Sequence, residues 1–253
     1  MHKAFTASAD SPANLHFFRA SEWSDASGDL SDGLKAQASA QGFKAANGDM
    51  VILANAEGGI ADVLFGLGDT NDALAVAALA AKLPEGDYQV SRDGDLEMAS
   101  IAAGWADGAY RFDRYLKDKA SPPRLVIGDG EDASALDREA DAIALLRDLI
   151  NTPAQDMGPN GIEAAIRILA EQHEADLTVI TGDDLLTENY PMVHAVGRAA
   201  PEAPRFIELS WGNADHPELA LVGKGVAFDT GGLNMKPGAG MKLIEITVEG
   251  FRS

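Results

Sequence analysis

The residues best able to do chemistry lie in one run near the carboxyl end of the chain. Leu219–Phe228 has the apolar pattern of a strand and carries one charge, Lys224, and Asp229 follows directly before the turn-forming Gly231-Gly232 pair. Ligands of open α/β sheets bind at the carboxyl ends of strands, where the Asp229 carboxylate would offer a hard oxygen to a cation. We therefore expect a cation site at this strand exit.

Lysines at two positions of this run suggest different roles. Lys224 lies between glycines in an apolar stretch, so partial desolvation together with a nearby divalent cation would favour the neutral amine, which can act as a ligand. Lys236, a few residues on, would stay charged and polarise a carbonyl. Spacing alone favours a simpler interpretation, in which a Gly-rich strand exit carries a lysine whose head reaches water.

Three other motifs match this chain poorly. Lys224 lacks the upstream glycine and the following Ser or Thr of a P-loop, and Phe228 occupies the last glycine position of a dinucleotide-binding turn. Residues 128–133 fit that turn better, but their three acids would face a pyrophosphate. Phe228-Asp229-Thr230-Gly231 is an aspartic-protease signature, yet that chemistry needs two carboxylates, and only a homodimer would supply the second.

The remaining polar residues offer weaker signals. The five histidines have no metal-ligand spacing such as HExxH, and we expect His194 to be packed and hydrogen-bonded. Residues 151–159 are typical of a turn that closes one helix and opens the next. No cysteine and no GxSxG elbow are present in the sequence.

Charge and composition exclude several classes of binding partner. The net charge of -20 opposes binding to nucleic-acid phosphates and anionic lipid. The absence of cysteine excludes disulfides and is compatible with a reducing compartment. The first residues lack the apolar region of a signal peptide, and the best apolar stretch, Ala73–Ala81, is half the length of a membrane span. We expect a soluble, cytoplasmic protein that binds neither nucleic acid nor membrane.

The pattern along the chain alternates strands with helices, which predicts an α/β fold with a mainly parallel sheet. Expected strands cover residues 4–7, 15–20, 50–55, 60–65, 88–91, 124–128, 177–180, 206–211 and 219–228. Expected helices cover residues 31–43, 73–83, 95–117, 135–150, 161–173 and 183–188. Residues 121–123 and 129–132 compete as the domain boundary. We choose the second, which gives domains 1–133 and 134–253.

Four blocks in this order resemble the leucyl aminopeptidase (cytosol aminopeptidase) family. They are residues 104–112 with Gly-Trp and Tyr-Arg-Phe, then 151–159, then 194–198, and finally Val222–Lys236 with its Val-Gly-Lys-Gly-Val-x-Phe-Asp-Thr-Gly-Gly run. Residues 1–100 match only in general architecture. The resemblance implies an N-terminal α/β domain, a connecting helix and the first part of an α/β metallopeptidase catalytic domain.

The resemblance also implies a function and its residues. Lys224 and Asp229 are similar to two metal ligands of the family, and Lys236 to the lysine that polarises the scissile carbonyl. The implied cofactors are two divalent ions, Mn, Zn or Mg, and the implied reaction is hydrolysis of N-terminal residues from peptides by a homo-hexamer.

After about residue 243 the sequence departs from the family pattern. Thr247 stands about where the family has its next ligand, an Asp, and the Asn-Thr-Asp-Ala-Glu-Gly-Arg block is absent. We therefore expect a truncated, frameshifted or misannotated product whose incomplete site binds metal weakly and has little or no peptidase activity alone. The alternative function is a non-catalytic assembly or binding module.

Overall fold

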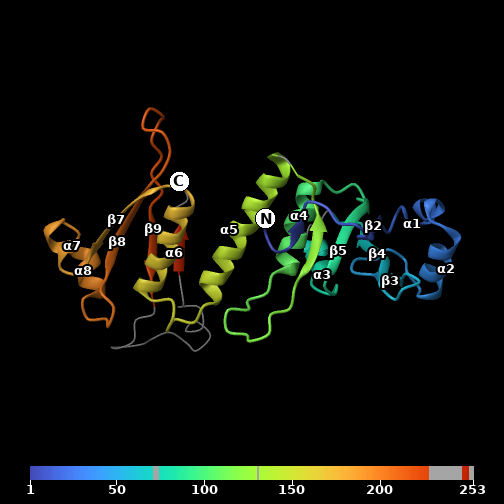
Figure 1. Cartoon of the computed structure of the whole chain (residues 1–253), viewed down its shortest axis with the longest axis horizontal. Helices are drawn as coiled ribbons and strands as arrows, with labels where there is room; N and C mark the ends of the chain where they lie inside the picture. Colours follow the sequence, from blue (N-terminus) through green and yellow to red (C-terminus); the bar gives the residue numbers. More distant parts are fainter. Residues whose placement is uncertain (71–73, 130, 228–246, 251–253) are drawn as a thin grey trace. The chain divides into compact units, whose positions relative to one another are not determined.

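The computed structural model describes residues 1–70, 74–129, 131–227 and 247–250 (Figure 1). The chain forms two compact units, Met1–Leu146 and Arg147–Ser253, and each is described by itself. Helix α5 (Glu131–Asn151) runs through both the expected boundary after residue 133 and the division after residue 146. The expected boundary stays a prediction.

A six-stranded sheet organises the first unit. Its order is β1-β6-β5-β2-β4-β3, and every neighbouring pair is parallel except the β3–β4 hairpin. The strands are β1 (Phe5–Thr6), β2 (Ala13–Arg19), β3 (Met50–Ala54), β4 (Ile60–Gly68), β5 (Gly86–Arg92) and β6 (Pro123–Val126). The predicted α/β class with a mainly parallel sheet is confirmed, and the strands expected over 50–55 and 60–65 pair with each other as the hairpin.

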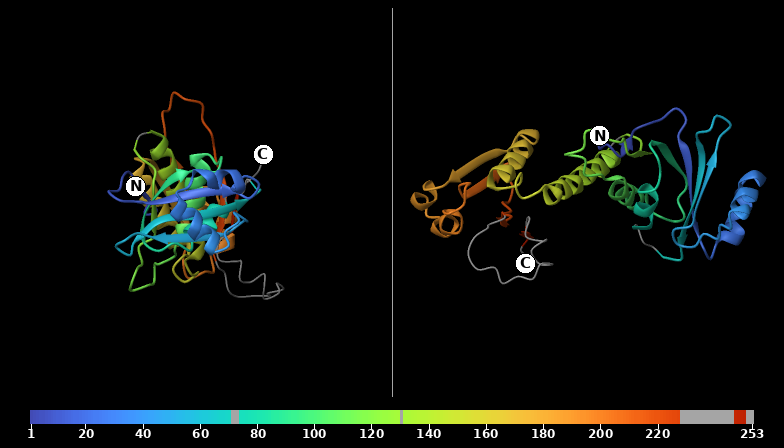
Figure 2. Two further views of the ribbon diagram at one scale, coloured as in Figure 1. Left: turned by 90° about the vertical axis from the view of Figure 1, so that its right-hand side faces the viewer. Right: turned by 90° about the horizontal axis from the view of Figure 1, so that it is seen from below.

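Alternation along β2 divides the first unit into two cores, because successive side chains point to opposite faces of a sheet. Leu15 and Phe17 are fully buried with helices α3 (Leu74–Ala80) and α4 (Met98–Ala109) in the larger cluster. Phe18 belongs to a second cluster, with residues of α1 (Trp23–Ala26) and α2 (Asp32–Ala40). A short 3-10 helix, η1 (Ser27–Asp29), follows α1. Helices thus lie on both sides of the sheet (Figure 2).

Helix α4 runs only from Met98 to Ala109, so the helix predicted over 95–117 is wrong at both ends. Trp105 is fully buried, but Tyr115 lies beyond the helix and is 52% exposed. Arg111 gives the reason. Its guanidinium donates to the carbonyls of Gly108 and Tyr110 at the end of α4, both at 2.8 Å, and so satisfies carbonyls that this helix leaves open. It also donates to the carbonyl of Ala81, just after α3, at 3.0 Å.

The second unit is built from short elements. They are α6 (Pro159–Gln172), β7 (Asp176–Thr181), α7 (Asp184–Thr187), α8 (Pro191–Gly197), β8 (Arg205–Ser210), β9 (Gly223–Val226) and β10 (Thr247–Gly250). Strand β7 pairs with β8, and β9 with β10, both antiparallel. The strand predicted over 219–228 is found only at Gly223–Val226. Residues 219–222 are exposed and have no strand pairing, and Phe228 lies outside the described residues.

Apolar burial differs sharply between the units. Both core clusters consist of residues before Leu146. Among the described residues of the second unit, the buried apolar side chains are Met157, Ala170 and Leu185. Trp211 and Leu221, on the extended stretch between β8 and β9 (Figure 1), are 74% and 88% exposed. Of the helices described, none combines the length and the apolar character needed to cross a membrane.

The contact between α3 and α4 predicts opposite effects for two glycine-to-alanine changes. A Cβ at Gly108 would lie 2.1 Å from the carbonyl oxygen of Ala77 on α3, so Gly108→Ala should lower the free energy of unfolding by roughly 1–3 kcal/mol. Gly33 lies in α2 with open space around its Cβ position, so Gly33→Ala should be neutral or stabilising by up to about 1 kcal/mol. Urea unfolding followed by circular dichroism measures both, and equal effects would contradict this packing.

Candidate functional site

Lys224 lies on β9, where its backbone pairs with that of Glu249 on β10. Its side chain is exposed. The partial desolvation expected for this amine is therefore not found. Burial therefore does not favour the neutral form of this amine that a ligand role would need.

The other predicted site residues, Asp229 and Lys236, lie outside the described residues. Thr247 begins β10 and pairs with Val226 through the backbone. Within the described ranges, no group of three His, Asp or Glu side chains converges on a point that could hold a metal ion. The described residues alone therefore do not make a metal centre.

The first turn of α6 comes near strand β9 at Gly225. A Cβ added at Gly225 would be 3.9 Å from Cδ1 of Ile162, so a small side chain at this position would fit without a clash. Gly225 itself is exposed, like its neighbour Lys224.

The turn between α5 and α6 has the structure that the sequence predicted. Thr152 is fully buried and its hydroxyl donates to the carbonyl of Asp148 at 2.6 Å, beside the last turn of α5. The backbone amide of Met157 donates to the carbonyl of Pro153 at 3.1 Å. Pro159 then occupies the first position of α6, where its missing N–H is not needed.

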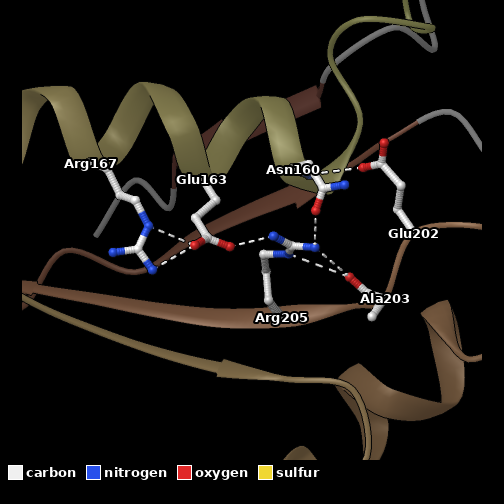
Figure 3. Close-up of polar contacts among 6 residues, drawn as sticks. All are labelled: Asn160, Glu163, Arg167, Glu202, Ala203 and Arg205. Atoms are coloured by element: carbon white, nitrogen blue, oxygen red, sulfur yellow. Dashed lines mark hydrogen bonds and ion pairs between the residues drawn. The ribbon is translucent and has the colours of Figure 1, made fainter.

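A carboxylate from a distant segment caps α6. The cap residue Gly158 has no side chain to accept a hydrogen bond, and Glu202 does so instead, accepting from the backbone amide of Asn160 at 2.8 Å (Figure 3). A negative group at a helix N-terminus is favourable for both hydrogen bonding and the helix dipole. A side chain at position 158 would collide with it, since a Cβ there would lie 2.6 Å from the Glu202 carboxylate.

Arg205 joins the first turns of α6 to strand β8. Its Nη1 donates to Oε2 of Glu163, and its Nη2 donates to Oδ1 of Asn160 at 2.6 Å and to the carbonyl of Ala203 at 3.1 Å (Figure 3). The Arg205 and Glu163 side chains are only 10% and 15% exposed. Arg167, one turn further along α6, donates to the other Glu163 oxygen at 2.7 Å and is 56% exposed.

These arginines change the ionisation of Glu163. Burial raises the pKa of its carboxyl, but the hydrogen bonds and charges of Arg167 and Arg205 lower it, and the net pKa lies below the usual value. The carboxylate is thus held in its charged form by two cations, of which Arg205 comes from another element.

His194 is packed and hydrogen-bonded, as predicted. Its Nε2 lies 3.0 Å from Oδ1 of Asp183, and its side chain is 16% exposed. One turn earlier, Tyr190 stacks on Phe206 of β8 with ring centroids 4.3 Å apart. His194 thus joins α8 to the start of α7, and Tyr190 at the start of α8 packs on β8.

The network around Arg205 was not found from the sequence. Glu163 and Arg167 are four residues apart, and this spacing is a recognisable helix pair. The link from Glu163 to Arg205 spans 42 residues and has no local signature, so a single sequence does not reveal it.

Comparison with known proteins identifies both parts of the chain. Residues 18–128 match the N-terminal domain of M17 aminopeptidases, and residues 144–251 match the catalytic domain of the cytosol aminopeptidase family. The second match extends past residue 243, where we expected the likeness to end.

Individual relatives agree with these matches. The probable cytosol aminopeptidase of Leifsonia xyli subsp. xyli is 31% identical over 228 residues, covering 83% of this chain and 46% of that protein. The crystal structure of cytosol aminopeptidase from Coxiella burnetii, at 31% identity, superposes with a TM-score of 0.83 over 94% of this chain and 52% of its own. The bottromycin maturation enzyme BotP in complex with Mn has 27% identity and a TM-score of 0.66, covering 92% of this chain and 51% of its own.

Fold, motif order and these matches define an α/β chain with an aminopeptidase N-terminal domain and part of a catalytic domain. The chain belongs to the cytosol aminopeptidase family. It spans about half the length of the relatives that it matches.

The depressed pKa of Glu163 predicts an acid-sensitive contribution to stability. Its carboxylate stabilises the fold above its unfolded pKa, and this contribution is lost as the pH falls through the lower folded pKa. Glu163→Gln should therefore destabilise the second unit near neutral pH by about 1–2 kcal/mol, and the difference from the unmodified chain should shrink in acid. Scanning calorimetry at several pH values measures this.

Glu171→Gln is the matched control, because Glu171 is an exposed acid near the other end of α6. It should produce no such pH-dependent difference. An effect of Glu163→Gln that is equal at neutral and acidic pH would contradict the role given to the Glu163 carboxylate.

Proposed function

We propose that this chain carries part of a metal-dependent aminopeptidase that removes N-terminal residues from peptides. The observation that carries the proposal is the Val222–Lys236 run within the segment that matches the family's catalytic domain. The domain order and the fold shared with the Coxiella burnetii enzyme support it.

Three residues receive roles in this proposal. Lys224 and Asp229 are two of the metal ligands, and Lys236 polarises the scissile carbonyl. The cofactors are two divalent ions, for which Mn, Zn and Mg are the candidates; a relative is known in complex with Mn. Bound ions of this kind supply Lewis-acid activation in peptide hydrolysis.

The chain alone should be a poor enzyme. Catalytic zinc normally has three protein ligands, whereas Lys224 and Asp229 together make two for a pair of ions. The exposed position of Lys224 also supports weak binding. We propose that the chain by itself binds metal weakly and has little or no turnover, that it is cytoplasmic, and that any homo-hexamer belongs to the complete family architecture.

A non-catalytic assembly or binding module is the second candidate. The observation in its favour is the contrast in burial, because the first unit has two cores while the second exposes Trp211, Leu219 and Leu221. Exposed apolar groups of this kind are typical of surfaces that another polypeptide covers.

Metal content and turnover separate these functions. The purified 253-residue chain, incubated with Mn²⁺ and desalted, should retain well under one ion per chain by mass spectrometry and should not hydrolyse leucyl anilide. Lys224→Met should weaken residual Mn²⁺ binding at least about tenfold, whereas the same change at Lys44, an exposed lysine of the first unit, should not.

Near-stoichiometric loading with two ions, together with chelator-sensitive turnover, would contradict the proposed inactivity and exclude the module. Equal Mn²⁺ binding by Lys224→Met and Lys44→Met would remove Lys224 from the ligand set.

A further inference from the structure

A cavity of about 360 Å³ lies in the first unit, where α1 and η1 come close to the end of β5. This volume is within the range of small-molecule sites. Most of the residues around it are ionisable, one as a cation and three as anions. The lining residues are Ser21, Glu22, Asp25, Ala26, Asp29 and Arg92.

Arg92 is the cation of this cavity, and it lacks an anionic partner. Its Cζ atom lies 5.2 Å from the centroid of the Phe18 ring, so the guanidinium is held over an aromatic face. Its Nε is buried and has no hydrogen-bond partner, and no carboxylate among the described residues forms an ion pair with this side chain. A partly buried guanidinium without an anion is costly, and a ligand carboxylate matches its planar fork of donors.

The three acids of the same cavity are also without a cationic partner. Glu22, Asp25 and Asp29 are exposed, and none of them forms an ion pair in the part of the chain that the structure describes. They share the cavity with Arg92 but do not pair with it. A ligand that carries both signs of charge can pair with the guanidinium and with the carboxylates at once.

Aromatic packing joins the two sides of the cavity. The ring of Trp23 belongs to α1, the helix that carries Asp25, and packs edge-on against Phe18 and Phe43, with centroids 5.0 and 4.8 Å apart. Phe18 is also the ring against which Arg92 lies. The charged groups are thus presented by a packed framework, which lowers the cost of ordering them when a ligand binds.

We propose that this cavity binds a free α-amino acid with a cationic side chain. The carboxylate of the ligand pairs with the guanidinium of Arg92, and its two cationic groups pair with the carboxylates of Glu22, Asp25 and Asp29. Three acids around one guanidinium favour a ligand with more positive than negative groups and oppose a simple anion. The site lies in the first unit alone, and binding there does not depend on the proposed peptidase function.

Three related ligands test which charges the site requires. In titration calorimetry of the full chain, L-lysine should bind about tenfold more tightly than cadaverine, which has both amines but no carboxylate. It should also bind about tenfold more tightly than L-leucine, which lacks the side-chain amine. Cadaverine binding as tightly as lysine would overturn the proposal, because a diffuse acidic surface attracts any diamine. Equal binding of leucine would overturn the preference for a cationic side chain.

Matched substitutions separate this cavity from the acidic surface in general. Arg92→Gln should weaken lysine binding at least about tenfold, and Asp25→Asn should weaken it severalfold. Arg124→Gln and Asp10→Asn should leave it unchanged, because Arg124 is already paired with Asp87 at 2.8 Å and Asp10 is an exposed acid outside the cavity. Arg92→Lys keeps the charge without the planar fork, so its affinity should lie between those of Arg92→Gln and the unmodified chain.

Nuclear magnetic resonance of the full chain locates the bound amino acid. Lysine should shift the backbone amide signals of residues 21–29 and of Arg92, whereas amides of the second unit should not move. Because Asp25 is exposed, weaker binding in Asp25→Asn does not reflect loss of the fold. Absence of lysine binding, unchanged affinity in Arg92→Gln, or shifts that miss residues 21–29 would overturn the proposal.

Discussion

Burial of apolar side chains is the constraint on which this structure depends. The first unit removes Leu15, Phe17 and Trp105 from water between its sheet and helices, and a second cluster around Phe18 covers the other face. At about 25 cal/mol per Å² of apolar surface, such burial is the main source of stability available to a chain without disulfides. The second unit has much less of it among its described residues.

This imbalance explains why polar contacts matter in the second unit. Where few apolar groups are buried, a largely enclosed ion pair such as Arg205–Glu163 contributes a larger share of the local order. Removing one partner of a buried pair is costly because the remaining charge is left uncompensated. The candidate ligand Lys224 lies on strand β9 of this unit, and its side chain is exposed.

Local patterns predicted much of the fold. The β3–β4 hairpin follows from two apolar runs that flank the turn at residues 55–59. In this turn the Asn55 side chain accepts hydrogen bonds from the backbone amides of Glu57 and Gly59. Helix α6 follows from Pro159 and the apolar spacing after it. The errors arose where residues distant in sequence decide the structure. Arg111, just after the end of α4, binds the carbonyl of Ala81 at the end of α3. The strand expected over 219–228 is short because residues 219–222 have no pairing partner among the described residues.

The candidate site was less predictable than the fold. The types and spacing of Lys224, Asp229 and Lys236 suggested cation chemistry, and family membership supports it, but their exposure and their neighbours depend on tertiary structure. The desolvation expected for Lys224 failed for this reason, since a glycine-flanked lysine is buried only if another element covers it. Arg205 escaped attention because its partners are 42 and 45 residues away in sequence.

Limited proteolysis with mass spectrometry tests the unequal division of burial most directly. The account predicts that the first cuts fall after Leu146, above all in the exposed stretch between Trp211 and Val222, and that residues 1–146 remain as one resistant fragment. Early cuts within the first unit, or equal resistance of both units, would contradict it.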